Sequence, residues 1–321
     1  MRRSISCLLW ILAAALPPAA QSQSYPSKPI RVIVPYPAGN TADISARLIG
    51  QKLTERFGQQ IIVDNRPGAS GQLGLDIAAR ATPDGYTIAV GQGGNMVVAP
   101  HTYKKIPYDP VKDFAPVALI ATNFLVLVAP PGSPFKDAGD MVRYAKANPG
   151  KLTVATNGEG GFPHLIFEDL RTMAGFTYLH VPYRGSAQIA TELMGGQVQI
   201  AVDGITGMAP YIRGGKLRLL GVTSPKRVSL FPDAPAVAES VPGYSSGGWF
   251  GFVAPANTPK QIIATLNKAI NDAMAMPDVH EKLNVAGLIP ANNTPEFFGD
   301  LIKSDLAKYG SLVRGIGFQP R

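Results

Sequence analysis

Glycines and polar side chains gather at one kind of place in this sequence, the turn that follows an apolar run and precedes a helical pattern. These turns are Tyr36–Asn40, Gln92–Asn95, Asn157–His164, Tyr183–Ser186 and the end of a run at Asp203. Glycine lets a ligand approach the backbone closely, and a helix start presents free N–H groups with a partial positive charge. Because the carboxyl ends of parallel strands meet at one edge of a sheet, the turns predict a shared site for a small anion.

Backbone groups at these turns supply enough energy for anion binding. A helix start contributes about 0.3–1 kcal/mol, and up to about 2 when partly buried. Two or three helix starts, with neutral hydrogen bonds, therefore support the roughly 8 kcal/mol of micromolar affinity without a dedicated Lys or Arg. The candidate ligand-binding residues are Tyr36, Ala38, Gly39, Asn40, Gln92, Gly93, Asn95, Asn157, Gly160, Gly161, Phe162, His164, Tyr183, Arg184, Gly185, Ser186 and Asp203.

Asp203 is the acidic candidate. It ends an apolar run at the predicted site, where an unpaired carboxylate is costly. Its partner is either a protein backbone group or an ammonium or N–H group of the ligand, and the sequence leaves both open.

Signals for catalysis are weaker. The segment 243–247 matches the G-x-S-x-G pattern, but it precedes an apolar strand instead of forming the strand-to-helix turn that a nucleophile needs. The four histidines lie far apart without carboxylates at metal-ligand spacing. His164 opens a helix, where a local hydrogen bond is favoured over catalysis. We therefore expect no catalytic residue, metal or cofactor, and keep a hydrolase that uses Ser186 or His164 as the less favoured alternative.

The first residues predict export. Arg2 and Arg3 precede an apolar run over 8–16 and then small residues, which is typical of a cleaved signal peptide over 1–22 and places the mature chain in the periplasm. The run is shorter than the roughly 20 residues that a membrane span needs. The single cysteine, Cys7, lies in this segment, so the mature chain has no disulfide.

The positive charge favours small anions over nucleic acid. The net charge is +8, yet Lys and Arg are scattered without basic runs or basic–aromatic alternation. A diffuse positive field attracts small anions.

Short apolar runs alternate with helical patterns, which predicts an α/β fold with parallel or mixed sheets. Helices are expected at 44–57 with Gly58 as the stop, at a capping box in Thr258-Pro-Lys-Gln261, and after Thr294-Pro295, where Phe297 and Phe298 are expected to face inward. The predicted strands are 30–36, 60–64, 86–91, 125–129, 152–156, 178–182, 198–203, 217–223 and 249–254.

Two segments, 123–131 and 245–255, combine an apolar strand with flanking glycine and proline, and we interpret them as crossings between two lobes. The first lobe then holds 25–126 and 249–321, and the second holds 127–248.

Short motifs along nearly the whole mature chain occur in a familiar order. They are Tyr25-Pro-Ser-Lys-Pro-Ile-Arg31, Val34-Pro-Tyr-Pro-Ala-Gly39, Asp64-Asn-Arg-Pro-Gly-Ala69, Thr82-Pro-Asp-Gly-Tyr-Thr87, Tyr108-Asp-Pro-Val-Lys-Asp-Phe-Ala-Pro-Val117, His180-Val-Pro-Tyr-Arg-Gly-Ser186, Gly195-Gly-Gln-Val-Gln199, Trp249-Phe-Gly-Phe-Val-Ala-Pro255 and Asn257-Thr-Pro259. In these motifs the sequence resembles the Bug (Bordetella uptake gene) receptors, the substrate-binding components of tripartite tricarboxylate transporters.

The resemblance implies a two-lobed periplasmic-binding fold, similar to type II, that closes on a carboxylate and delivers it to membrane transport subunits. It also implies that the turns at 36–40 and 157–164 hold the carboxylate, while 92–95, 183–186 and Asp203 serve the rest of the ligand. We expect a monomer. An exported sensor of the same fold that has no transporter is the alternative.

Two turns depart from the family pattern. The usual Pro-Gly-Gly reads Ala38-Gly-Asn40, so an amide side chain is expected to replace a backbone contact. The usual Gly-Thr-Ser-x-His reads Gly160-Gly-Phe-Pro-His164. Loss of the hydroxyls and gain of an aromatic ring predict a ligand that is bulkier or flatter than a small dicarboxylate, aromatic acids included.

Overall fold

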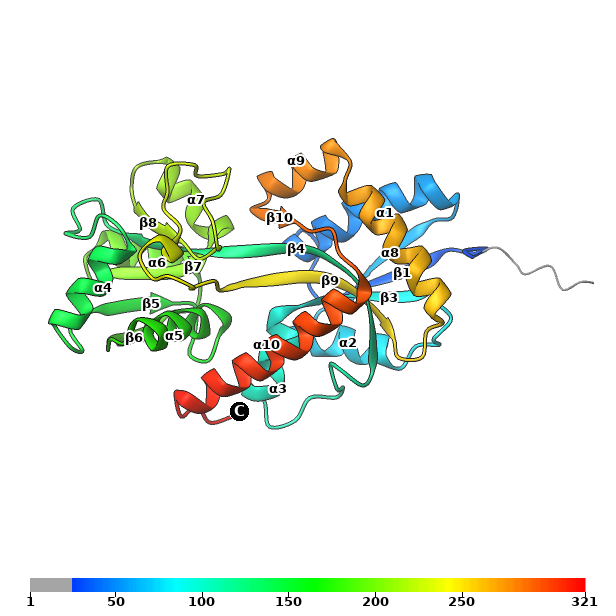
Figure 1. Cartoon of the computed structure of the whole chain (residues 1–321), viewed down its shortest axis with the longest axis horizontal. Helices are drawn as coiled ribbons and strands as arrows, with labels where there is room; N and C mark the ends of the chain where they lie inside the picture. Colours follow the sequence, from blue (N-terminus) through cyan, green and yellow to red (C-terminus); the bar gives the residue numbers. More distant parts are fainter. Residues whose placement is uncertain (1–24, 321) are drawn as a thin grey trace, which may run out of the picture.

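Two strands, β4 (Phe114–Ala129) and β9 (Gly247–Pro255), join two lobes in the computed structural model, which describes residues 25–320 (Figure 1). The sheet order is β2-β1-β3-β9-β4-β7-β5-β6, with β8 and β10 also pairing with β4. The predicted signal peptide, residues 1–22, lies outside the described residues. In the described part of the chain, no helix has the length and apolar character needed to cross a membrane.

The first lobe is built on parallel strands in which β1 lies between β2 and β3, and β3 pairs antiparallel with β9. Alternate residues of β1 enter opposite core layers, because strand side chains point to opposite faces. Val32 packs with α1 and α8, whereas Ile33 packs with α2 and α10. Both faces are therefore covered by helices, as the apolar character of both sets of residues predicts. The elements are β1 (Ile30–Val34), α1 (Thr41–Phe57), β2 (Ile61–Asn65), α2 (Gln72–Ala79), β3 (Thr87–Gln92) and α3 (Ala99–Thr102), with a π-helical turn at Gly94–Val98.

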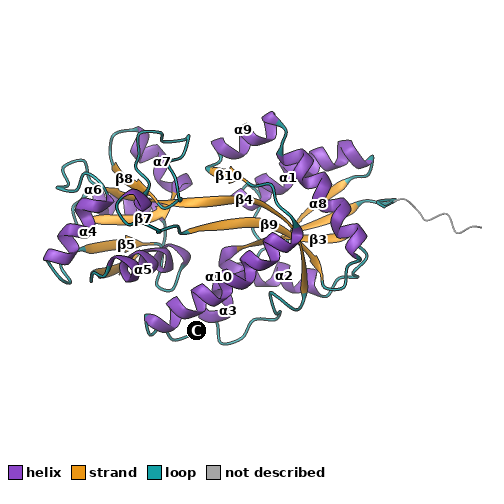
Figure 2. Cartoon of the chain, in the orientation of Figure 1, coloured by secondary structure: helices purple, strands orange, loops and turns teal. Residues whose placement is uncertain are grey.

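The second lobe repeats this layering around β5, which lies between the parallel strands β6 and β7 (Figure 2). The end of β4 adds to it by pairing antiparallel with β7 and β8. Here too, Leu127 and Val128 enter different core layers. The elements are α4 (Ala138–Ala147), β5 (Thr153–Thr156), α5 (Phe162–Ala174), β6 (Leu179–Pro182), α6 (Ser186–Met194), β7 (Ile200–Gly204), α7 (Ile205–Arg213) and β8 (Arg218–Val222).

Strand β4 is longer than the sequence predicts. Residues 114–124 pair with β9 in the first lobe, and residues 125–128 pair with β7 in the second. The sequence analysis assigned only 125–129 to a strand, and the part that it missed contains Pro116, which cannot donate to a ladder. The strand accommodates Pro116 at a shift of register between Pro116 and Ala118. The residue limits of the lobes, 25–126 with 249–321 and 127–248, stay a prediction.

The last elements return to the first lobe, and their ends test the capping predictions. The Thr294 side chain accepts a hydrogen bond from the Phe297 amide, so this cap is confirmed. The capping box at Thr258 is wrong, because the Thr258 hydroxyl donates to the Pro255 carbonyl and the cap residue is Pro259. These elements are α8 (Lys260–Met274), α9 (Pro277–Val285), β10 (Leu288–Pro290) and α10 (Pro295–Gly315).

Helix α10 connects the lobes. Its buried face carries Phe298, whereas Phe297 is 57% exposed, so the inward placement predicted for Phe297 is wrong. Toward its end, Lys308 Nζ lies 2.6 Å from Asp169 Oδ2 on α5 of the second lobe. In Figure 1 the helix crosses the front of the molecule from one lobe to the other.

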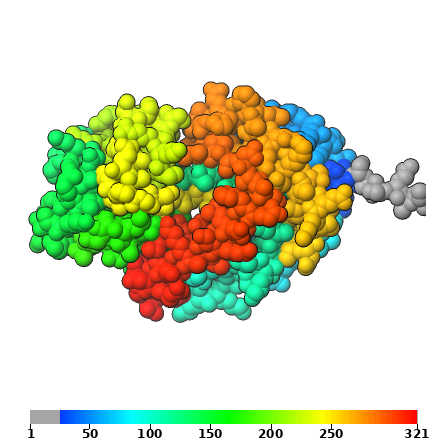
Figure 3. All heavy atoms as spheres, viewed as in Figure 1, coloured from blue at the N-terminus to red at the C-terminus, as the bar shows by residue number. Residues whose placement is uncertain are grey.

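A hollow lies beside α10 where the lobes meet. Strand β4 is visible at its base in Figure 3, between α10 and loops of the second lobe. The pocket has a volume of about 280 Å³ and is lined by residues that include Asn123, Ser246 and Asp305.

Candidate ligand-binding site

The predicted turns all follow strands, and each has a glycine that borders open space. At 157–164 this glycine is Gly158, whereas a Cβ atom added at Gly160 would lie 2.5 Å from the Phe318 ring. A Cβ atom added at Gly39, Gly94, Gly158, Gly185 or Gly204 would meet no atom within 4 Å. The backbone of each turn is therefore accessible to a small molecule at that point. This is the property that the glycines predict, although the identity of the ligand-binding residues stays a prediction.

Helix α5 begins without a side-chain cap. Its cap residue is Gly161, and Pro163 lies in the first turn. Pro163 has no N–H, and the Gly160 amide donates to His164 Nδ1 at 3.0 Å. The first-turn amides of a helix have no partner within the helix, so the start of α5 offers free donors to an anion.

Helices α6 and α7 begin in the same way. Their cap residues are Gly185 and Gly204, and neither helix has a side-chain cap. Both glycines follow strands that lie in the same sheet as β5. The second lobe therefore presents three uncapped helix starts that glycine introduces.

Asp203 lies among these helix starts and is 2% exposed. Its Oδ1 accepts hydrogen bonds from the Gly204 amide at 2.8 Å and from Asn157 Nδ2 at 3.3 Å. Its Oδ2 is buried and has no hydrogen-bond partner among residues 25–320. Burial raises the pKa of Asp203, and the Ser186 hydroxyl and Gly204 amide offset only part of that rise. One oxygen has a backbone donor, whereas the other has only the Ser186 side chain near it, without a hydrogen bond of normal geometry.

The start of α1 in the first lobe is different, because the protein caps it. Asn40 Oδ1 accepts from the Asp43 amide at 2.9 Å, and Asp43 Oδ2 accepts from the Gly39 amide at 2.9 Å. Burial alone would raise the pKa of Asp43, but hydrogen bonds from Arg47, Gly39 and Asn65 hold it below its usual range. The dipole role expected for an acidic residue in this turn is only part of its function, since Asp43 also holds the turn together.

The other first-lobe turn is fixed by Asn95, which is fully buried. Asn95 Oδ1 accepts from the Gln92 amide at 3.0 Å, its Nδ2 donates to the Tyr36 hydroxyl at 3.5 Å, and its carbonyl accepts from the Tyr108 hydroxyl at 2.7 Å. Burial raises the pKa of Tyr36 and keeps the phenol neutral. Asn95 thus joins the two first-lobe turns and positions them. Tyr108, which the sequence reasoning missed, is part of this arrangement.

The turns of the two lobes meet at Phe162. A Cβ atom added at Gly93 would lie 3.6 Å from the Phe162 ring, and one added at Gly248 would lie 3.0 Å from it. The structure therefore brings 92–95 close to the start of α5, with Tyr36 linked through Asn95.

At the turn 183–186, the backbone amides of two predicted ligand residues are bonded within the protein. Tyr183 and Arg184 are partly buried and exposed, respectively, and their amides bond to the Thr156 carbonyl and to Gln188 Oε1. Ala38 is also exposed. Of this turn, Ser186 is the residue that lies beside Asp203.

His164 is held by the protein, as the sequence favoured. Its ring stacks on that of His180 with centroids 3.9 Å apart and planes 5° apart. Because Nδ1 accepts from Gly160, the proton of the neutral ring is on Nε2, which lies 3.8 Å from Glu168 Oε1. Burial, and to a lesser degree His180, lowers the pKa of His164 to about 4. A local hydrogen bond therefore explains His164 without catalysis.

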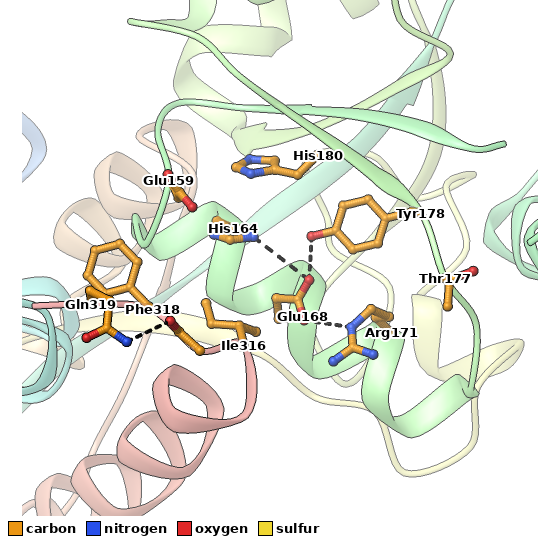
Figure 4. Close-up of a pocket in the computed structure, with 11 residues that line it drawn as sticks. Glu159, His164, Glu168, Arg171, Thr177, Tyr178, His180, Ile316, Phe318 and Gln319 are labelled. Carbon is orange, nitrogen blue, oxygen red and sulfur yellow. Dashed lines mark hydrogen bonds and ion pairs between the residues drawn. The ribbon is translucent and has the colours of Figure 1, made fainter. Parts of the chain in front are cut away.

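A pocket of about 630 Å³ lies beside this histidine pair (Figure 4). Glu168 occupies its wall and accepts hydrogen bonds from the Tyr178 hydroxyl and Arg171 Nε, each at 2.6 Å. His164 is the predicted ligand residue that lines it. Sequence reasoning missed this pocket wall, although His164, Glu168 and Arg171 are three and four residues apart, the spacing of residues on one helical face.

Three observations on the described residues bear on the catalytic alternatives. The segment that matches G-x-S-x-G precedes β9, as predicted, and does not form a strand-to-helix turn. In the described chain, the hydrogen bonds of His164 and His180 go to the Gly160 amide and the Thr156 hydroxyl, and not to Ser186. Within residues 25–320, no group of three or more His, Cys, Asp or Glu side chains is arranged to hold a metal ion.

Comparison with known proteins places this geometry in a family. Residues 45–318 match the tripartite tricarboxylate transporter family receptor. BugT of Bordetella pertussis is 31% identical over 311 residues, which cover 96% of this chain and 95% of BugT. An R. palustris structure with adipate is 31% identical with a TM-score of 0.76, covering 92% of this chain and 100% of that one.

The structure of MatC from Rhodopseudomonas palustris with bound malate is also 31% identical, with a TM-score of 0.70, covering 90% of this chain and 100% of that one. The resemblance to the Bug receptors and the predicted fold are thereby confirmed. This chain belongs to the tripartite tricarboxylate transporter family of receptors.

Proposed function

We propose that this chain is a periplasmic receptor that binds a small organic carboxylate between its lobes and delivers it to membrane transport subunits without chemical change. The observation that carries the proposal is the start of α5, where Gly161 provides no cap beside the junction of the lobes. A partly buried helix start contributes up to about 2 kcal/mol to an anion. The chain acts as a monomer in this proposal.

The buried carboxyl group of Asp203 places a second requirement on the ligand, which is a hydrogen-bond donor. Asp203 Oδ2 is buried without a hydrogen bond of normal geometry in the described chain, although the Ser186 hydroxyl lies beside the carboxyl. A buried oxygen of this kind is costly unless a well-placed donor reaches it. We assign this donor to the ligand, as a hydroxyl or amine next to the carboxylate. Malate, the ligand of the related MatC structure, carries such a hydroxyl.

Neutral backbone groups suit a receptor that must also release its ligand. The proposed site holds the carboxylate by amides and not by a dedicated Lys or Arg, so its affinity is moderate. Lobe closure is favoured only by as much as the ligand binds the closed form better than the open one.

Thermal unfolding in the presence of malate, succinate, adipate and benzoate tests the proposal. At a hundredfold excess over Kd, a ligand adds about 2.7 kcal/mol to the stability. We expect a rise in Tm with at least one acid, saturable titration by calorimetry, and recovery of the unchanged acid by mass spectrometry. No rise with any carboxylate contradicts binding, and loss of the acid contradicts a receptor without turnover.

A further inference from the structure

The Phe162 side chain leaves the first turn of α5 and reaches the other lobe. The far edge of its ring faces the first lobe, since Cε1 and Cζ lie 3.0 and 3.1 Å from the position of a Gly248 Cβ. Cε2 lies 3.6 Å from the position of a Gly93 Cβ. The ring therefore fills the space that two glycines leave open on β9 and on the turn after β3.

The ring is also anchored on the side of α10. Its centroid lies 5.7 Å from that of Tyr309, with the planes tilted by 48°. Phe162 packs against the buried cluster of the second lobe and against that of the first. Such aromatic contacts are directional, so they fix the orientation of the ring and not only its burial.

The ring adjoins the proposed carboxylate anchor. Phe162 is the first residue of α5, directly after the uncapped Gly161. In the proposed function, a carboxylate held at this helix start extends its other end between the lobes. The path toward Gly93 and Gly248 is occupied by the ring.

We infer that Phe162 determines ligand length: its ring closes the path between the start of α5 and β9, so the receptor selects short carboxylates over long ones. The inference rests on the proposed function. It also changes the expectation drawn from the sequence, where an aromatic residue suggested a bulkier or flatter ligand. The ring contacts protein on its far edge and takes space from the ligand.

The length preference is measured with succinate, adipate and suberate, whose chains differ only in methylene groups. An excluded methylene group costs roughly tenfold in affinity. We expect the wild-type protein to bind succinate at least about tenfold more tightly than suberate. Phe162→Ala should reduce this ratio at least about tenfold, mainly through tighter binding of suberate.

Phe297→Ala is the matched control, because Phe297 is exposed on α10. It should keep the wild-type ratio. If Phe162→Ala does not fold, Phe162→Leu keeps part of the apolar contact and should give an intermediate ratio.

The outcomes distinguish a failure of the proposed function from a failure of the inference about Phe162. If the wild-type protein binds none of the acids, the proposed function fails and the inference with it. If it binds them and Phe162→Ala weakens all three equally, the ring only stabilises the fold and the inference alone is overturned. A ratio within about twofold of wild type in both Phe162 variants overturns it as well.

Discussion

The starts of α1 and α5 are the same kind of turn in the two lobes, yet a side chain caps only one of the two helices. At α1, Asn40 and Asp43 satisfy backbone amides of their own turn. At α5, Gly161 offers no side chain, and α6 and α7 begin at glycine as well. A side chain bonds the amide four residues before it in both turns, Asp43 in the first lobe and His164 in the second. The difference is that Asn40 also caps the third amide of α1, whereas no side chain caps α5.

This difference indicates what each of the two lobes contributes to ligand binding. A capped turn is rigid and adds stability, but its satisfied amides have little left for a ligand. An uncapped helix start is less stable and binds anions better. We therefore expect the second lobe to supply most of the anion affinity, and the first lobe to supply shape.

Giving α5 the cap that α1 has should produce the largest effect. Gly161→Asp places a carboxylate on the free amides and repels the ligand, so affinity should fall about a hundredfold, or about 2.7 kcal/mol. The unfolding free energy should rise by about 1 kcal/mol. Calorimetry and urea unfolding measure the two changes.

Gly161→Ala is the control for Gly161→Asp, since it adds the same Cβ without charge. It should lose no more than about fivefold in affinity. Equal losses in the two variants would contradict the assignment of the carboxylate to this helix start.

Lowering the pH should reduce the unfolding free energy through His164. Its pKa in the folded protein is about 4, below the ordinary value of 6.5, so the unfolded chain takes up a proton first. Stability is therefore lost as the pH falls from about 6.5 to about 4, by up to about 3 kcal/mol. Urea unfolding at several pH values should show this fall, and His164→Gln should show a smaller one. Parallel pH profiles for the two proteins would rule out His164 as the source.

Asp203→Asn tests the second requirement placed on the ligand. If Oδ2 accepts a ligand hydroxyl, the affinity for malate should fall about tenfold relative to that for succinate, which lacks the hydroxyl. Removing a buried charge should at the same time leave the protein as stable or more stable. Titration of both acids measures the ratio, and an unchanged ratio would assign Oδ2 no ligand contact.

Removing the cap of α1 should have the smallest effect on binding. Asn40→Ala loses the acceptor for the Asp43 amide and should cost about 1 kcal/mol of unfolding free energy. Asn40→Ser keeps an acceptor and should lose less. Affinity should change less than in Gly161→Asp, and a larger change would show that the Asn40 amide itself binds the ligand and that the two lobes contribute alike.

Much of the fold was predictable because strands and helices have local periods. The strands apolar on both faces were found within a few residues, and Gly58 ends α1 with a φ of 65° as predicted. The errors have physical causes. The missed start of β4 contains Pro116, a residue that is unfavourable within a sheet and that β4 accommodates at a register shift. Strand β10 has three residues, which are too few for a pattern. Phe297 and Phe298 are neighbours, and the packing of α10 decided which one is buried.

The candidate site was predictable in position but not in its hydrogen bonds. The glycine turns do border open space, because a strand followed by glycine and a helix places the turn at a sheet edge. The roles of Asn40 and Asn95 were not visible, since each is set by a partner across the turn or on another element. Phe162 is the clearest case, because its contacts lie on segments more than sixty residues away.

The sequence by itself determined the kind of protein and where its turns lie, because apolar periodicity, glycine and proline act within a few residues of the chain. Only the tertiary structure decided which amides remain free, that Asp203 keeps an unpartnered oxygen in the described chain, and that the Phe162 ring lies between the lobes. The physical reason is that a hydrogen-bond donor is free or satisfied according to everything that folding brings near it, and those neighbours come from distant parts of the chain.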